Sequence, residues 1–230
     1  MKTLSSQHRT RALTLVEVLI VIAVLLVLVA MYLPTLANRN TRSSRISCVN
    51  NLKQVGLAFR IWQGDNNDKF PMSVSVTNGG TMELVESGTV WWHFAAMSNE
   101  LNTPKILTCP NDSERPKNVT ITWGDIPSAP YDANISTNNT NTSYFIGVDA
   151  ADTSPNMFLA GDRNLTVKNI ALNPGLHSLT TNEIVGWTAK LHVNQGNVLM
   201  ADASVQMLST SGLQAALIKT GIATNRLAMP

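Results

Sequence analysis

An apolar run near the N-terminus constrains this 230-residue chain more than any other feature. Residues 13–33 read LTLVEVLIVIAVLLVLVAMYL and carry a single charge, Glu17. At 1.5 Å per residue a helix of this length is about 31 Å long, which matches the hydrocarbon core of a bilayer. No second stretch of the sequence is apolar enough to span a bilayer, so a polytopic membrane protein is excluded.

Charged residues are distributed unevenly about this run. Residues 1–45 contain six Lys or Arg and one acid, whereas residues 46–230 contain 11 bases and 14 acids. The basic residues on both sides of the run suit contact with anionic lipid headgroups. The body of the chain is mildly acidic and has no basic patch in its sequence, so we expect no nucleic-acid partner.

Three interpretations of the run compete. A cleaved secretory signal would use Arg9 and Arg11 as its basic region and end near Ala37, but the run is longer than a usual signal core. A plain signal anchor fits the length but gives no reason for the carboxylate. The third interpretation assigns Glu17 a function, because a charge inside a membrane helix is costly and needs a partner. Three basic residues lie on each side of the run, so they do not set its orientation.

The segment from Arg11 to Val18, RALTLVEV, favours the third interpretation. It resembles the N-terminal signature of type IV pilins and type II secretion pseudopilins. The resemblance implies that a prepilin peptidase cuts between Ala12 and Leu13, that the new amine is methylated, and that Glu17 neutralises the amine of a neighbouring subunit. Pro34, 21 residues after Leu13, matches a helix-kinking proline of the family. The family prefers Gly before the cut and Phe after it, where this chain has Ala12 and Leu13.

The same resemblance implies a location and a set of partners. The chain would cross the inner membrane once, with its globular domain in the periplasm, and would reach a filament or the cell surface after assembly. Its partners would be homologous pilin or pseudopilin subunits, the prepilin peptidase, an inner-membrane assembly platform and membrane lipid.

Beyond Pro34 the pattern predicts a second, amphipathic stretch of helix. Apolar residues recur at every third or fourth position, at Ile46, Val49, Leu52, Val55, Phe59 and Trp62. Gly64 and the polar residues 65–68 end the pattern, which gives a helix of roughly fifty residues. The expected organisation is a leader (1–12), a membrane-spanning helix (13–36), its amphipathic continuation (37–64) and a globular domain (65–230).

The remaining sequence predicts short strands separated by turns and loops. Short β-prone pieces fall at 73–76 and 89–92, a short strand ends in the turn at 107–112, and the polar residues 111–143 form a long loop. Further strands are expected at 143–148, 157–160, 197–201 and 205–208, and a helix at 212–219. The predicted fold is therefore α+β and pilin-like: a long N-terminal helix packed on a small antiparallel sheet with long loops.

Several segments of this second half resemble a pilin-like family abundant in Planctomycetes and Verrucomicrobia. They are SCVNNLKQ at 47–54, CPND at 109–112 and AGDRN at 160–164. His192, nine residues and then Asp202 match that family's His-x9-Asp-Gly signature, with Ala203 in place of the glycine.

Cys48 and Cys109 are the two cysteines of the chain, with 60 residues between them. In an extracytoplasmic protein we expect them to form one disulfide, and two buried free thiols are the alternative. Closing a loop of this length contributes on the order of 4 kcal/mol in the chain-entropy model. Because there is no CxxC motif and no clustered histidine, no zinc site is expected.

His192 and Asp202 are candidates for a general-base pair or for metal ligands. Asp202 falls at the turn of an expected hairpin, where Asp usually caps its own backbone, so we expect a structural hydrogen bond between the two residues instead of catalysis. Asp65, Asp68, Asp149, Asp152 and Asp162 are weak candidates for calcium ligands, because calcium prefers oxygen ligands. None of these acids has EF-hand spacing.

These observations predict a structural protein and not an enzyme: a subunit of a type IV pilus-like or type II secretion pseudopilus filament, made as a prepilin. The alternative is a membrane-anchored periplasmic enzyme or binding module, with the apolar run as a plain anchor and the His192–Asp202 region as its site.

Overall fold

The computed structural model describes residues 14–115, 123 and 139–230, and within helix residues 32–42 it describes the backbone alone. The chain divides into two compact units, Met1–Arg42 and Ser43–Pro230.

One helix, α1 (Leu15–Asp65, 51 residues), begins in the first unit and ends in the second. Its length confirms the prediction of a helix of roughly fifty residues, and it ends beside Gly64 as expected. Helical backbone continues through Pro34 without interruption. The kink expected at Pro34 falls where the backbone alone is described, so it stays a prediction.

Within the second unit the predicted apolar stripe of α1 is largely buried. Leu52, Val55 and Phe59 are completely buried and Trp62 is 5% exposed. Ile46 differs from the prediction, because 54% of it is exposed. The buried part of the stripe therefore begins near residue 48 and forms one wall of the core.

Residues 71–107 form short helices, which corrects the sequence-based prediction of β-prone pieces at 73–76 and 89–92 and of a strand ending near 107. The elements are η1 (Pro71–Ser73), η2 (Val76–Asn78), η3 (Met82–Ser87), α2 (Val90–Ala95), α3 (Ser98–Leu101) and η4 (Pro104–Leu107). In α2, Val90, Trp91 and Phe94 are fully buried. Their burial at helical spacing outweighs the β preference of Val, Thr and Trp, which is weak and depends on context.

Antiparallel strands follow in the described residues from 144 onwards. They are β1 (Tyr144–Gly147), β2 (Phe158–Asp162), β3 (Leu165–Val167), β4 (Ile170–Ala171), β5 (Gly175–Thr180), β6 (Val185–Trp187), β7 (Gln195–Met200), β8 (Val205–Ser209) and β9 (Thr224–Met229). Six form a sheet in the order β5-β9-β1-β2-β7-β8, and β4-β3-β6 form a second, smaller sheet. The strands expected at 143–148, 157–160, 197–201 and 205–208 are confirmed as β1, β2, β7 and β8.

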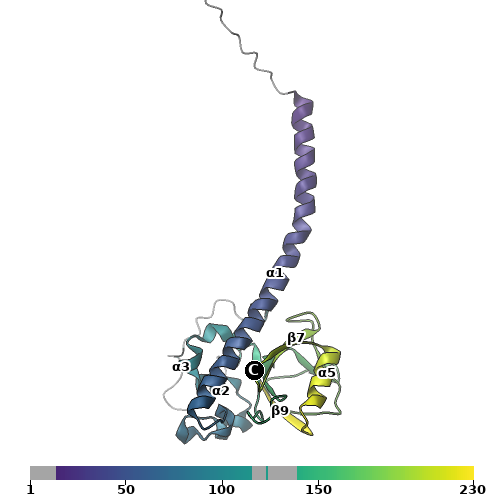
Figure 1. The fold of residues 1–230 in the computed structure, drawn as a ribbon. Coiled ribbons are helices and arrows are strands. Elements are labelled where there is room, and N and C mark those ends of the chain that lie inside the picture. The colour runs from purple at the N-terminus through teal and green to yellow at the C-terminus, as the bar shows by residue number, and fades with distance from the viewer. Residues whose placement is uncertain (1–13, 116–122, 124–138) are drawn as a thin grey trace, which may run out of the picture. The chain divides into compact units, whose positions relative to one another are not determined.

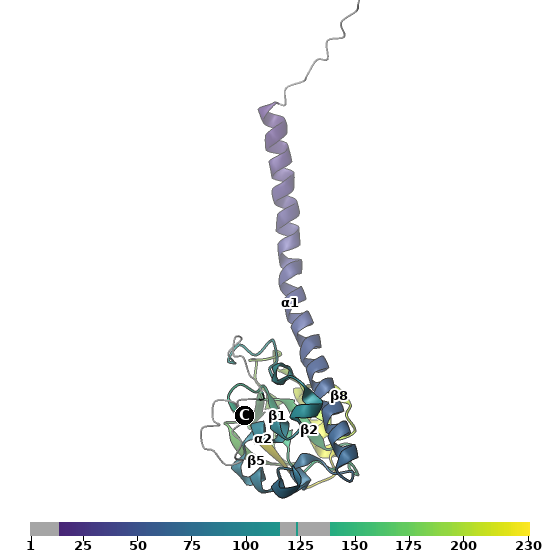
Figure 2. The ribbon, with the colours of Figure 1, turned by 90° about the vertical axis from the view of Figure 1, so that its left-hand side faces the viewer.

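The large sheet is covered on both faces, as Figures 1 and 2 show. Tyr144 and Ile146 of β1 pack in one core with α1 and α2, whereas Phe145 between them packs in a second core with α5 (Thr210–Lys219). This alternation follows from the two-residue period of a strand. The arrangement confirms the predicted α+β fold of a long helix on an antiparallel sheet.

Candidate functional site

At its N-terminus α1 begins with a reciprocal set of hydrogen bonds between Thr14 and Glu17. The backbone N–H of Glu17 donates to Thr14 Oγ1 (3.3 Å), while Glu17 Oε2 accepts from the backbone N–H (2.8 Å) and the hydroxyl (3.0 Å) of Thr14. This is a capping box, which satisfies N–H groups that a helix start leaves without partners. The spacing Thr-x-x-Glu indicates this local role of Glu17, which the predicted pairing with a neighbouring subunit does not include.

The apolar side chains that follow Glu17 are solvent-exposed in the isolated chain. The exposed fractions of the large ones run from 46% at Val18 and Leu28 to 68% at Met31. Among the residues whose side chains are described, no helix is both long and apolar enough to qualify as a membrane span. Ala12 and Leu13 lie outside the described residues, as does the side chain of Pro34.

In the second unit the predicted disulfide between Cys48 and Cys109 is present. Cys48 lies on α1 and Cys109 follows η4, with their Cα atoms 5.1 Å apart, and both residues are completely buried. The side-chain amide of Asn51, one turn further along α1, donates to the carbonyl of Thr108 (3.2 Å). The bridge and this bond together fix the 108–109 segment against the helix.

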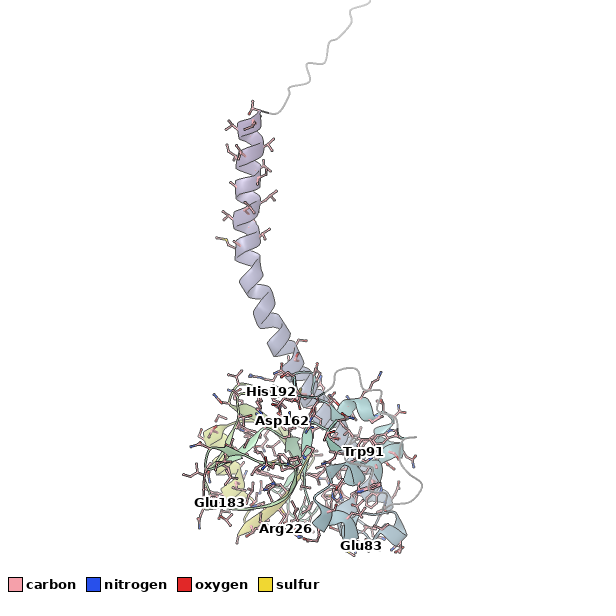
Figure 3. The ribbon with its side chains drawn as sticks, turned by 180° about the vertical axis from the view of Figure 1, so that it is seen from behind. Glu83, Trp91, Asp162, Glu183, His192 and Arg226 are labelled. Atoms are coloured by element: carbon pink, nitrogen blue, oxygen red, sulfur yellow. A yellow bond between two sulfur atoms is a disulfide. The ribbon has the colours of Figure 1, made fainter. Side chains whose placement is uncertain are left out.

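His192 lies beside the disulfide and is 2% exposed. Its Nε2 is 3.6 Å from Cys109 Sγ and 3.3 Å from Asp162 Oδ2, so the sulfur and the carboxylate both face the same ring nitrogen. Asp162 ends β2, and the backbone N–H and side-chain amide of Asn197 on β7 donate to its Oδ2 (2.7 and 2.9 Å). Figure 3 shows His192 and Asp162 next to each other.

Burial sets the charges of this pair. It raises the pKa of Asp162 to about 7, against the opposing effect of the two bonds from Asn197. Burial, and then the positive charge of Arg45, lower the pKa of His192 to about 4. At neutral pH His192 is therefore neutral, and its contact with Asp162 is not an ion pair. Two buried atoms, Asp162 Oδ1 and His192 Nδ1, have no hydrogen-bond partner among the described residues.

Arg45 connects the start of this part of α1 to the segment that carries His192. Its guanidinium donates to the carbonyl oxygen of His192 (3.1 Å) and to Gln195 Oε1 (2.9 Å). Because each bond spans about 150 residues of sequence, no local pattern could have revealed it.

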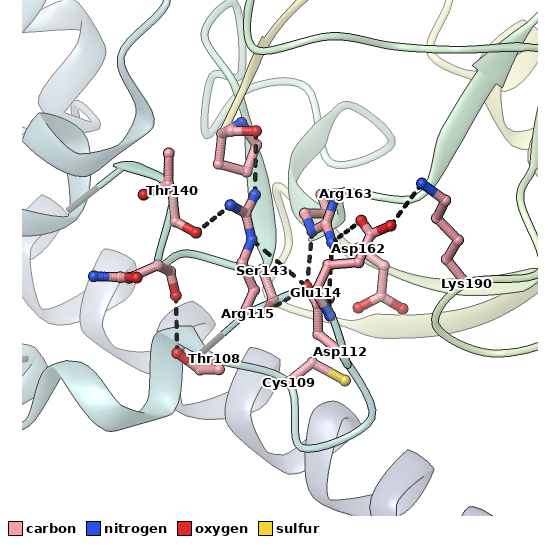
Figure 4. Close-up of polar contacts among 12 residues, drawn as sticks. Thr108, Cys109, Asp112, Glu114, Arg115, Thr140, Ser143, Asp162, Arg163 and Lys190 are labelled. Carbon is pink, nitrogen blue, oxygen red and sulfur yellow. Dashed lines mark hydrogen bonds and ion pairs between the residues drawn. The ribbon is translucent and has the colours of Figure 1, made fainter. Parts of the chain in front are cut away.

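A network of charged groups holds the segment after Cys109, as Figure 4 shows. Arg163 donates through two nitrogens to the buried carboxylate of Asp112 (2.7 and 2.8 Å) and through Nη2 to Glu114 (2.7 Å), and the hydroxyl of Ser143 also donates to Asp112 (2.9 Å). Hydrogen bonds from Lys190 and Arg163 lower the pKa of Glu114 to about 2. Since Arg163 follows Asp162 and Lys190 precedes His192 by two residues, this network also positions the buried pair.

Asp202 does not pair with His192, which corrects the expected bond between them. Its Oδ1 accepts from the backbone N–H of Ser204 (2.8 Å) at the turn between β7 and β8, so it caps its own turn as predicted. The carboxylate partner of His192 is Asp162. Ala203 in the same turn has φ 66°, so it adopts the left-handed conformation that usually favours glycine.

The acids considered as calcium ligands do not form one site in the described part of the chain. The carboxylate of Asp149 accepts three hydrogen bonds from the guanidinium of Arg226 (3.0, 3.3 and 2.7 Å), and Asp152 pairs with Arg60. Asp65 and Asp68 belong to no cluster of metal-ligating side chains among the described residues. The one such cluster there consists of Cys48, Cys109 and His192, whose ligand atoms all lie within 4.8 Å of one another.

In a comparison with known proteins, residues 7–33 match the family model of the prokaryotic N-terminal methylation motif. The matched segment contains the capping box and the apolar run. No curated protein and no solved structure matches the chain. The chain therefore carries a prepilin-type N-terminal motif, which supports a type IV pilin-like protein or pseudopilin, with pilin-family partner subunits and processing by a prepilin peptidase.

Proposed function

We propose that this chain is the precursor of a structural subunit of a type IV pilus-like or type II secretion pseudopilus filament. In this proposal the peptidase cuts between Ala12 and Leu13, the new amine is methylated, and α1 passes from the inner membrane into the core of a filament. The globular unit lies in the periplasm before assembly and on the filament surface afterwards. The observation that carries the proposal is the motif match at residues 7–33.

The first turns of α1 support this role physically. Seventeen consecutive residues, Leu15–Met31, present apolar side chains on all sides except at Glu17, and a surface of that kind requires lipid or other helices around it. Both hydrogen bonds that the Glu17 carboxylate accepts from Thr14 are made by one oxygen, Oε2. The other oxygen, Oε1, can then accept from the amine of a neighbouring subunit while the capping box stays intact.

The buried group around His192 supports a structural role over an enzymatic one. In a nucleophile–His–Asp triad the carboxylate orients one ring nitrogen while the nucleophile uses the other. Here the carboxylate and the sulfur both face Nε2, and the sulfur belongs to a disulfide. The three residues are also buried, which closes them to a substrate.

Substituting Glu17 by Gln tests the assembly role separately from helix capping. Gln at this position serves a capping box as well as Glu does, but it carries no charge with which to neutralise an amine. We expect the Glu17→Gln chain to insert into the membrane like wild type and to be lost from filaments. The matched control is Thr14→Ala, which removes the capping hydroxyl and keeps the carboxylate. Membrane abundance and the yield of sheared or cross-linked filaments are compared in a host with the assembly machinery.

Wild-type incorporation of the Glu17→Gln chain would contradict amine pairing and leave capping as the only role of Glu17. Processing has its own measurement, the intact mass and N-terminal sequence of the protein from its membranes. We expect 218 residues beginning at methylated Leu13, since 12 of 230 are removed. A start at Met1 or at Asn38 would favour the plain anchor or the secreted form.

A further inference from the structure

We propose that Cys48, Cys109, His192 and Asp162 form a buried site for a zinc-type metal ion when the two cysteines are thiols, and that the disulfide is the alternative state of the same site. Three of these residues form the one cluster of potential metal ligands in the described part of the chain. The inference does not depend on filament assembly. It also revises the sequence-based expectation of no zinc site.

The distances around His192 fit a tetrahedral zinc centre. Zinc binds thiolate at about 2.3 Å and imidazole or carboxylate at about 2.0–2.2 Å, so the ligand atoms of a tetrahedral site lie about 3.3–3.8 Å apart. Cys109 Sγ and His192 Nε2 are 3.6 Å apart, and His192 Nε2 and Asp162 Oδ2 are 3.3 Å apart. One ring nitrogen thus lies at ligand spacing from both a sulfur and a carboxylate oxygen.

The hydrogen bonding of the disulfide state leaves this group incompletely satisfied. A single N–H on Nε2 points to one acceptor, yet an acidic oxygen and a sulfur both face that nitrogen. Asp162 Oδ1 is fully buried without a partner among the described residues. A cation placed between Cys109, His192 and Asp162 would be faced by a lone pair from each of them, and the proton of the neutral imidazole would then lie on Nδ1, which has no partner among the described residues.

The charges of the site suit such an ion. Two thiolates, one carboxylate and a divalent cation sum to a single negative charge, and the guanidinium of Arg45 lies close enough to influence both His192 and Asp162. Asn197 holds Asp162 with two hydrogen bonds to the oxygen that faces His192, the kind of support that fixes a ligating carboxylate.

The two states interconvert by a balanced reaction. A dithiol reductant donates two electrons and two protons, the Cys48–Cys109 bond breaks, two thiols form, and the reductant becomes a disulfide. Binding of the metal ion then releases the two thiol protons, because the ligands are thiolates. Since the cysteines are completely buried, we expect loading to occur while the chain folds and before oxidation.

The test uses the full chain in detergent: it is reduced with a dithiol in denaturant, the dithiol is removed in the absence of oxygen, and the chain is refolded in the presence of Zn²⁺ or Co²⁺ alone. We expect one ion per chain, the charge-transfer absorption of a cobalt–thiolate bond, and protection of both thiols from alkylation. Air-oxidised wild type should bind no ion at this site. Both His192→Gln and Asp162→Asn should weaken metal binding. For His192→Gln we expect a loss of affinity of about 100-fold or more, which exceeds the 10–100-fold loss typical of residues that only support a metal ligand. The matched control is His177→Gln, at a half-buried histidine on β5.

Folding competence is followed in the same samples by near-ultraviolet circular dichroism. A reduced wild-type chain that gives no cobalt–thiolate spectrum would overturn the proposal, whether it is folded or stays unfolded with the metal. If the His192→Gln chain bound Zn²⁺ or Co²⁺ with the same affinity as wild type, the proposal would be overturned as well. If His192→Gln fails to fold, the comparison of reduced and oxidised wild type decides the outcome.

Discussion

Acidification should destabilise the globular unit through His93, a residue of α2 that is completely buried. The hydroxyl of Thr81 lies 2.7 Å from its Nδ1, and its Nε2 has no hydrogen-bond partner among the described residues. Burial lowers the pKa of His93 to about 4 from the 6.5 of an exposed histidine. The ring therefore stays neutral in the folded protein at pH values where the unfolded chain is already protonated.

The sign and size of the effect follow from proton linkage. Between about pH 6.5 and pH 4 the unfolded state binds one more proton at His93, so the free energy of unfolding falls as the pH falls. At 1.36 kcal/mol per pKa unit, the full loss is about 3 kcal/mol. Below about pH 4 both states are protonated and His93 causes no further loss.

The assay is denaturant unfolding in detergent, followed by tryptophan fluorescence. All five tryptophans lie in residues 43–230, so the signal reports on that unit alone. The matched variant is His93→Gln, which keeps a polar group near Thr81 and does not titrate. We expect the free energy of unfolding of wild type to fall by about 3 kcal/mol more than that of the variant between about pH 7 and pH 4. Equal losses in the two proteins would refute the reasoning, whatever constant difference the substitution introduces.

Two further predictions concern packing and charge near the buried group. Arg163→Ala should cost about 3 kcal/mol of stability because it leaves the buried Asp112 carboxylate without its main partner; Lys168→Ala, which removes an exposed ion pair, should cost less than about 1 kcal/mol. Equal losses from the two variants in the same unfolding assay would contradict this ranking. Gly196→Ala should cost about 2 kcal/mol, because its Cβ would lie 2.4 Å from a tryptophan ring on β6. Gly64→Ala should stabilise the protein by about 0.5–1 kcal/mol, because no atom lies within 4 Å of the added Cβ. A loss of stability in this variant would show that the space around the Cβ is not open.

Much of the fold could be predicted because its signals are local in sequence. The stripe on α1, the strands β1, β2, β7 and β8, and the hairpin turn at Asp202 each follow from the spacing of neighbouring residues. The short strands β3, β4 and β6 were missed because segments of two or three residues carry too little pattern. Strands β5 and β9 were missed as well. Each is six residues long, and their pairing with each other is a contact across the chain that local patterns do not show.

In the candidate site, too, the residues that are close in sequence could be predicted and those that are far apart could not. Thr14 and Glu17 are three residues apart, so a short motif identifies them. His192 and Asp162 come from separate segments and meet only because β2 pairs with β7, where Gly161 is opposite Val198. Spacing in sequence suggested Asp202 as the partner of His192, and the sheet register places Asp162 there instead.

The position of this buried group on α1 has a mechanical consequence. Arg45 and Cys48 are one turn apart on the helix, and they bind the segments that carry His192 and Cys109. If the proposed filament forms, a pull along α1 would reach the globular unit first through a guanidinium hydrogen bond and a covalent bond, before the packing of Leu52 and the residues beyond it is strained. Reduction of the disulfide without metal binding would leave only non-covalent contacts between this part of α1 and the rest of the unit. A metal ion held by both thiolates would restore a bridge between Cys48 and Cys109, so either state of the site attaches the helix to the segment after η4.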